Sequence, residues 1–404
     1  MAATPTLTAA QRRARLARRH RLLPADRTDD VAVIAEDLLG LHSTDPVTVY
    51  LSALARMRHP SLAAVDAALY TDRTVLRHHA MRRTLWVATA ATMRRMHATT
   101  TARYAATEHR RMVGLLEGNG IADGEEWLVA AKRDVLELLR AAGPMTAREL
   151  GQRIPALAHP LRLSIGKPYE GVQAAHSRVL LQLGFEGSLV RTRPVGSWIS
   201  GQYTWAAMDT WLPGGVHGPD GAPLPERESA RDLARHWLHR FGPGTSADLQ
   251  WWMGWTATTT RRALAEAEAV AVDLDGVPGW VAPEDLEPAP TEDAGEPGEP
   301  WVAVLPGLDP TTMGWKERSW YLPPAAADAF DRNGNGGPTV WVDGEVVAGW
   351  VQARDGAIRL CWFTDVPAAR RAQVLARVEE VRDWLGEVRF SVRFPAPYAK
   401  GLQV

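Results

Sequence analysis

Apolar residues recur at three- and four-residue steps in two stretches near the middle of the chain, and each stretch ends at a Gly-Pro step. The apolar sets are Leu128, Val135, Leu136, Leu138 and Leu139 in the first stretch, and Leu233, Ala234, Trp237, Leu238 and Phe241 in the second. This spacing places each set on one face of an α-helix. Two amphipathic helices are therefore predicted.

The two helices are followed by the same eight-residue pattern, G-P-x-T-x-x-[ED]-L, at residues 143–150 and 242–249. Gly-Pro ends the preceding helix, and the threonine caps the next one. The acidic residue three positions later can reach back to the cap, which is the arrangement of a capping box. The chain therefore contains an internal near-repeat.

A further helix and a β-hairpin are predicted after each copy of the pattern. The helices are 171–185 and 258–268, and the hairpins pair 188–193 with 197–205 and 270–274 with 277–281. Asp275-Gly276, between the last two strands, is a favoured tight turn. Helix, capped helix, helix and hairpin form a winged helix-turn-helix, so this unit occurs twice.

The N-terminal part can be interpreted as a third copy, and the C-terminal part as mainly β-structure. The first has helices at 28–41, 46–57 and 61–70, strands at 74–77 and 84–88, and a long basic helix at 90–117. The second has strands at 340–343, 345–350, 358–363 and 388–394 and a helix at 367–385. The segments 213–226 and 287–300 resemble insertions. We expect an α+β protein with domains at 1–120, 121–212, 227–286 and 301–404.

Composition narrows the function classes. The chain has 404 residues, of which 46% are hydrophobic, enough for several domains. Its one cysteine, Cys361, excludes a disulfide framework and a cysteine-based zinc site. No apolar run is long enough for a membrane span, and the basic N-terminus lacks the apolar middle of a secretory signal. We expect a cytoplasmic protein with no membrane partner, no cofactor and no metal.

The net charge is only −1, but the charges are segregated. Residues 1–120 hold 18 Lys+Arg and 10 Asp+Glu, a balance of +8, which leaves 28 basic and 37 acidic residues, or −9, for the rest. A basic N-terminal part is typical of a polyanion-binding surface.

Tandem winged helices most often bind duplex DNA, through a helix in the major groove and basic wings on the backbone. Candidate DNA contacts are Arg82, Arg94, Lys167, Gln173, Arg178, Arg191 and Arg193. Two alternatives remain open, because winged helices also dock proteins and a polar helix face can simply be solvated.

The segment GLHSTDP, residues 40–46, carries four polar side chains between two predicted helices. Asp45 before Pro46 is a favourable N-cap, with proline at the first helical position. One cap residue suffices, so His42, Ser43 and Thr44 exceed what capping requires. The segment is therefore either a turn with a cap or a loop that positions a water for catalysis.

The chain resembles the winged-helix DNA glycosylases of the AlkZ and YcaQ type over nearly its whole length. The resemblance is carried by the paired G-P-x-T repeats and by GLHSTDPVTVYLSALARM, LRHHAMRRTLWVAT, VLPGLDPTTMGWKER and VWVDGEVVAGW. It implies three tandem winged helices in a C-shaped molecule that cups double-stranded DNA. It also implies a monofunctional glycosylase for alkylated or crosslinked purines, which often gives a producing bacterium resistance to its own genotoxin.

The chain departs from this family in the catalytic motif. The AlkZ type has Gln-apolar-Gln before Asp-Pro and the YcaQ type has Gln-apolar-Asp, whereas His42, Ser43 and Thr44 stand at these positions here. Either catalysis is lost, or His42, Thr44 and Asp45 perform it, with Ser43 contacting DNA and one Asp45 oxygen left free by the cap.

The chemistry favours catalysis, because an N7- or N3-alkylated purine is already a good leaving group. A Schiff-base lyase step is not expected, since none of the four lysines lies near the segment. We therefore hypothesise a monomeric, monofunctional glycosylase for bulky or alkylated purines of the N7-guanine or N3-adenine type. The alternative is a non-catalytic winged-helix DNA-binding protein, such as a transcriptional regulator.

Overall fold

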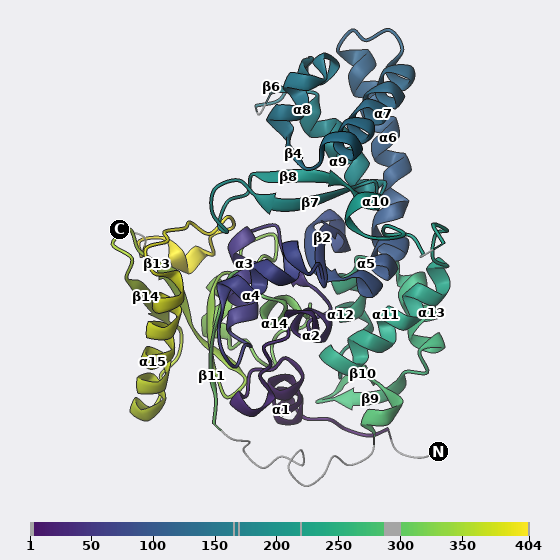
Figure 1. Cartoon of the computed structure of the whole chain (residues 1–404). Coiled ribbons are helices and arrows are strands. Elements are labelled where there is room, and N and C mark those ends of the chain that lie inside the picture. The colour runs from purple at the N-terminus through teal and green to yellow at the C-terminus, as the bar shows by residue number, and fades with distance from the viewer. Residues whose placement is uncertain (1–3, 165, 169, 219, 287–299, 403–404) are drawn as a thin grey trace. The chain divides into compact units, whose positions relative to one another are not determined.

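The computed structural model describes residues 4–164, 166–168, 170–218, 220–286 and 300–402. The chain forms two compact units (Figure 1). The first comprises residues 1–75, 86–92 and 230–404, and the second comprises 76–85 and 93–229. Both mix helices with antiparallel strands, so the predicted α+β class is confirmed. The predicted insertion 287–300 lies outside the described residues, apart from Pro300.

The second unit contains the element order predicted for the first G-P-x-T copy. Its elements there are α7 (Gly124–Ala142), β4 (Met145–Thr146), α8 (Ala147–Arg153), α9 (His176–Phe185), β7 (Leu189–Pro194), β8 (Tyr203–Ala207) and α10 (Met208–Trp211). Strand β8 pairs with both β7 and β4. The apolar face of α7 packs on α9 and β8, around Leu128, Val135 and Leu139.

One predicted helix in this unit begins later than expected. Residues 171–185 were predicted to be helical, but Gly171–Ala174 form strand β6, which pairs with β5 (Pro160–Leu163). Helix α9 starts only at His176. The glycine and the β-branched valine at 171 and 172 disfavour helix, and the pairing with β5 satisfies their backbone groups. Gln173 therefore lies on a hairpin strand.

The long basic helix predicted at 90–117 is present but interrupted. It consists of α5 (Ala90–Met96), a π-helical turn (His97–Thr101) and α6 (Ala102–Gly118). Thr99 and Thr100 donate their hydroxyls to the carbonyls of Arg95 and Met96, four residues earlier. Such back-bonding competes with the regular helical pattern, which is consistent with the local widening.

The first unit begins with the N-terminal elements. They are α1 (Ala9–Arg19), a 3₁₀ turn (Pro24–Asp26), α2 (Val31–Asp37), β1 (Leu41–His42), α3 (Pro46–Leu54) and α4 (Leu62–Asp66), which continues as a π-helical turn (Ala67–Thr71). Strand β1 pairs antiparallel with β3 (Leu85–Thr89), so that His42 lies opposite Trp86. Every residue of α3 is buried, so this helix forms part of the core.

The second G-P-x-T copy also lies in the first unit and has the predicted elements. These are α11 (Glu226–Phe241), α12 (Ser246–Met253), α13 (Ala257–Glu266), β9 (Val270–Leu274) and β10 (Val277–Val281), with the two strands paired as expected. Both predicted capping boxes are confirmed, Thr146 with Glu149 and Thr245 with Asp248. The near-repeat therefore marks the same local structure twice.

The C-terminal part is a four-stranded antiparallel sheet covered by a helix (Figure 1). The strands are β11 (Val302–Leu305), β12 (Thr339–Val342), β13 (Glu345–Gln352) and β14 (Ile358–Trp362), with the short helix α14 (Pro310–Met313) after β11 and helix α15 (Ala368–Leu385) packed on the sheet. The predicted strand 388–394 is wrong, because these residues form no ladder. Gln352 instead bonds the backbone of Val388 and Phe390 through its side-chain amide.

Candidate functional site

The GLHSTDP segment forms a sharp connection between α2 and α3. Leu39 and Gly40 have φ values of 49° and 94°, which turn the chain after α2 into the short strand β1. The His42 ring packs edge-on against Trp86, with ring centroids 4.7 Å apart. His42 is 4% exposed, and its Nδ1 accepts a hydrogen bond from the Thr44 N–H at 3.4 Å. Packing and hydrogen bonding therefore both orient this imidazole.

Asp45 caps helix α3 as the sequence predicted, but neither of its oxygens is left free. Oδ1 accepts a hydrogen bond from the Val47 N–H at 3.4 Å, and Oδ2 accepts one from the Arg393 N–H at 3.1 Å. The expected free oxygen is a wrong prediction, because a segment 348 residues away supplies the second donor. Burial raises the pKa of the Asp45 carboxyl, an effect that the two N–H donors and the Arg393 charge oppose.

Arg393 is the residue of this site that the sequence did not identify. Besides the backbone bond to Asp45, its guanidinium Nη1 donates to the Thr44 carbonyl at 3.3 Å. The residue itself is exposed, so a positive charge lies at the surface beside the loop. Nothing in the local sequence around residue 393 indicates this role, because only the tertiary fold brings it to GLHSTDP.

The Thr44 hydroxyl differs from the other polar groups of the loop. Its Oγ1 is buried and forms no hydrogen bond with any residue that the structure describes. A buried hydroxyl without a protein partner carries a desolvation cost unless a water or ligand completes its bonding. The Thr44 hydroxyl therefore has hydrogen-bonding capacity that no residue in the described part of the chain uses.

Beneath the loop, helix α3 is fixed to the segment 304–318 by buried polar contacts. The Thr48 hydroxyl donates to the Gly307 carbonyl at 2.6 Å, and the Ser52 hydroxyl donates to Asp309 at 2.6 Å. Arg56 binds Asp309 through two nitrogens, at 2.8 and 2.9 Å, and both side chains are fully buried. Two segments that carried the family resemblance thus form one rigid support.

The structure places most predicted DNA contacts in the second unit, on several different elements. Lys167 and Arg193 are exposed, next to the β5–β6 hairpin and at the end of β7. Arg191 stacks on the Trp205 ring, with its guanidinium 4.7 Å from the ring centroid. Arg94 donates to the carbonyls of Gly215 and Pro213 at 3.0 and 2.7 Å.

Three other predicted contacts lie in a turn, beside a cavity and in the buried interior. Arg82 lies in the turn after β2 (Val75–His79), with a φ of 53°. Arg178 lines a cavity between α6 and α9. Ser43 belongs to the first unit and is fully buried, so its side chain presents no surface that DNA could contact in this conformation.

Neither a metal site nor a membrane-spanning helix is found among the residues that the structure describes. No three His, Cys, Asp or Glu side chains gather there in a way that could hold a metal ion. None of the helices in the described ranges has both the length and the apolar character needed to cross a bilayer.

Comparison with known proteins agrees with the resemblance predicted from the sequence. Residues 35–384 match the family described as DNA glycosylase AlkZ-like. The solved structure of the Streptomyces sahachiroi DNA glycosylase AlkZ superposes with a TM-score of 0.65. It is 20% identical in sequence, and the match covers 96% of this chain and 100% of that one. No curated protein matches the chain. The predicted resemblance is confirmed.

Proposed function

The chain belongs to the AlkZ-like family of DNA glycosylases, and from this premise we propose that it excises bulky or alkylated purines from duplex DNA by hydrolysis alone. The purines are those substituted at N7 of guanine or N3 of adenine. The lesion is a proposal of its own, because 20% identity to a solved relative carries the fold and not the substrate.

The proposed chemistry needs little from the protein. An alkylated purine is cationic and leaves readily, so the enzyme has to place a water at C1′ and stabilise an oxocarbenium-like sugar. The Asp45 carboxylate supplies the negative charge, and its raised pKa makes it a better proton acceptor than an exposed aspartate. The Thr44 hydroxyl would hold the water, and His42 would orient the loop.

The observation that best supports catalysis is the unpartnered Thr44 hydroxyl next to a buried carboxylate. A loop that served only as a turn would gain nothing from an unsatisfied buried hydroxyl, which costs about 1–3 kcal/mol. At the position of Thr44 the AlkZ type has a glutamine and the YcaQ type has an aspartate, so both types carry a polar side chain there. The Thr44 side chain together with a bound water would reach about as far as a glutamine side chain.

For DNA binding, we interpret the three repeated element groups as winged helix-turn-helix units. The proposed contacts are the exposed cations Arg193 and Lys167 together with Arg82, Arg178 and Arg191 in the second unit. These side chains would neutralise backbone phosphates, which fixes the protein on the duplex without reading its sequence.

The decisive experiment uses a duplex that carries one N7-alkylguanine. Hydrolysis releases the alkylated base and leaves an abasic site, and the strand breaks only after later treatment with alkali. Strand cleavage without alkali would contradict the monofunctional assignment. A panel of small and bulky adducts in the same sequence then defines the lesion class. The resemblance also implies self-resistance, which is tested by asking whether the protein protects cells against the genotoxin that forms the excised adduct.

A non-catalytic DNA-binding protein is the second candidate, and one observation favours it. Both Asp45 oxygens already accept backbone hydrogen bonds, as they would in a purely structural cap. This candidate predicts duplex binding with no released base for any adduct in the panel. Base release from any adduct at a rate above that of the protein-free duplex excludes it.

A further inference from the structure

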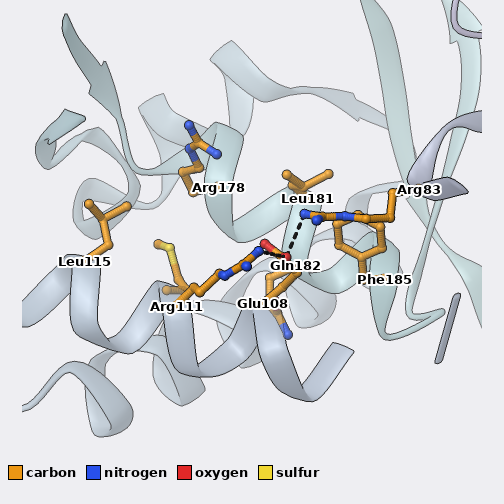
Figure 2. Close-up of a pocket in the computed structure, with 9 residues that line it drawn as sticks. Arg83, Glu108, Arg111, Leu115, Arg178, Leu181, Gln182 and Phe185 are labelled. Carbon is orange, nitrogen blue, oxygen red and sulfur yellow. Dashed lines mark hydrogen bonds and ion pairs between the residues drawn. The ribbon is translucent and has the colours of Figure 1, made fainter. Parts of the chain in front are cut away.

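The second unit contains a cavity of about 290 Å³ between helices α6 and α9, and Arg83 from the turn Met81–Arg83 also lines it (Figure 2). Its polar lining is dominated by charge, with three arginines, Arg83, Arg111 and Arg178, and one glutamate, Glu108. Leu181 and Phe185 provide part of an apolar wall. The four charged residues sum to +2.

The carboxylate in the cavity is shared between two guanidinium groups. Glu108 Oε1 accepts hydrogen bonds from Arg83 at 2.6 Å and from Arg111 at 2.7 Å. Glu108 is 15% exposed, whereas the Arg83 and Arg111 side chains are 40% and 62% exposed. Ion pairs with such exposed partners contribute little to stability. The arrangement is therefore poorly explained as a brace between helices.

The third arginine lacks this counter-ion. Arg178 Nε is buried and forms no hydrogen bond with any residue in the described part of the chain. Gln182, which also lines the cavity, is 2% exposed, and its Oε1 accepts no hydrogen bond from those residues. Arg178 and Gln182, two residues that line the cavity, thus each carry a buried polar atom whose hydrogen-bonding capacity no residue in the described part of the chain uses.

The backbone that carries Arg83 is strained. Arg82 and Arg83 have φ values of 53° and 64°, in the left-handed region that non-glycine residues seldom occupy. A turn selected for stability would have Asn-Gly at such positions. Two successive arginines with positive φ indicate that the identity of the side chains outweighs the backbone cost, which is characteristic of binding sites.

We propose that this cavity is a binding site for a phosphate group and that Glu108 is the resident anion that the phosphate displaces. Guanidinium groups match phosphate oxygens in pairs of parallel hydrogen bonds, which makes arginine the preferred phosphate ligand. Displacement of the Glu108 carboxylate would let Arg83, Arg111 and Arg178 donate hydrogen bonds to one phosphate. The shared chemistry is a phosphate ester, which could come from a DNA backbone or from a free phosphate compound.

The proposal deepens the DNA-binding role proposed above for Arg178, but it does not depend on base excision, because the cavity belongs to the second unit and GLHSTDP belongs to the first. Binding can therefore be measured with inorganic phosphate and the full-length protein, without any lesion. Equilibrium dialysis at constant ionic strength, with chloride replacing phosphate, removes the general salt effect.

The test compares two double variants of helix-borne arginines. Arg111→Ala with Arg178→Ala removes two cavity cations, whereas Arg103→Ala with Arg110→Ala removes two arginines of α6 that do not line the cavity. We expect about a tenfold or greater loss of phosphate affinity in the first and little change in the second. Equal affinity in the two double variants overturns the proposal.

A third variant tests the displacement of Glu108. Glu108→Gln keeps the side-chain size but removes the competing charge, so phosphate should bind about tenfold more tightly than in the unmodified protein. Unchanged or weaker binding overturns the displacement. Unlabelled duplex with 5′-hydroxyl ends is then added as a competitor. Loss of bound phosphate identifies a DNA backbone phosphate as the ligand, and retention identifies a free phosphate compound.

Discussion

The backbone N–H of Arg393 donates a hydrogen bond to Oδ2 of Asp45 at 3.1 Å, while the other Asp45 oxygen caps helix α3. Arg393 lies in the segment after α15, and Val392 in the same segment packs close to Gly307. The loop, the start of helix α3 and the C-terminal segment therefore meet at one carboxylate. A change at Asp45 should affect both chemistry and local structure, and the two effects can be separated.

Asp45→Asn removes the charge and keeps one oxygen for the cap on Val47. Its amide nitrogen cannot accept the Arg393 N–H, so we expect a loss of about 1 kcal/mol of unfolding free energy. Single-turnover release of an alkylated base should fall about a hundredfold, or about 2.7 kcal/mol of barrier. Urea unfolding and base release are measured on the same preparation.

Asp30→Asn is the matched control, because Asp30 caps helix α2 through the N–H groups of Ala32 and Val33. Asparagine caps nearly as well as aspartate, so this variant should lose neither stability nor activity. If Asp45→Asn also keeps the full rate of base release, the catalytic role of the Asp45 carboxylate is excluded.

Changes at His42 and Thr44 test the rest of the loop. His42→Ala should slow base release, because it removes the ring that packs on Trp86 and accepts the Thr44 N–H. His42→Gln restores the residue that the family has at this position and should recover most of the rate. Thr44→Val removes the hydroxyl that would hold the water while keeping the shape, and should be slower than Thr44→Ser. Equal rates in the two Thr44 variants would exclude a role for the hydroxyl.

We expect the ion pair Arg56–Asp309 to hold helix α3, and with it the GLHSTDP loop, on the segment 304–318. Both side chains are fully buried, so Asp309→Asn leaves a buried guanidinium without its charge partner. Removing one member of such a pair costs about 3–5 kcal/mol. Urea unfolding should show this loss, whereas Arg140→Ala should hardly change it because the Arg140–Asp209 pair is about half exposed. A small effect of Asp309→Asn would mean that the site is not supported through this pair.

The local structure of this chain could be predicted largely from its sequence, because the responsible signals are local. The two G-P-x-T repeats set capping boxes that depend only on residues three positions apart, and both are present. The turn at Asp275-Gly276 likewise fixed the register of β9 and β10. Strand β6 was missed because it depends on pairing with β5, which no periodicity in 171–185 indicates.

The candidate site could be predicted only in part, for the same physical reason. The Asp45 cap follows from its neighbours, and it was predicted. The second bond of Asp45 comes from Arg393, and the partner of Arg56 is Asp309, more than 250 residues away in both cases. Contacts of this kind are set by the packing of whole elements, so a pattern within either segment could not indicate them.

DNA binding should depend on salt and on exposed cations of the second unit. Arg193→Ala should weaken binding to undamaged duplex uniformly across sequences and reduce the slope of log affinity against log salt by about 1. Arg133→Ala is the control, since Arg133 is an exposed cation that is paired with Asp134. Fluorescence anisotropy at several salt concentrations measures both. An identical slope in the two variants would contradict a phosphate contact by Arg193.

Acid should destabilise the second unit through three buried histidines, His78, His79 and His97. His78 Nε2 lies 3.2 Å from His97 Nδ1, and the His79 ring packs on Phe185 at 4.7 Å. Burial lowers the pKa of His79 to about 3 and of His97 to about 4, and lowers the pKa of His78 well below its ordinary value. His79 and His97 therefore stay neutral in the folded protein near pH 5.

The unfolded chain binds protons at His79 and His97 below about pH 6.5, whereas the folded chain does not until about pH 4 or lower. Stability is therefore fully present above pH 6.5 and falls as the pH decreases towards 4, by up to about 1.4 kcal/mol per pH unit for each histidine. His97→Gln removes one such group, so its unfolding free energy should fall less steeply over this range. Urea unfolding between pH 7 and 4.5 measures the slopes, and equal slopes in the His97 variant and the wild type would exclude a neutral His97 in the folded state.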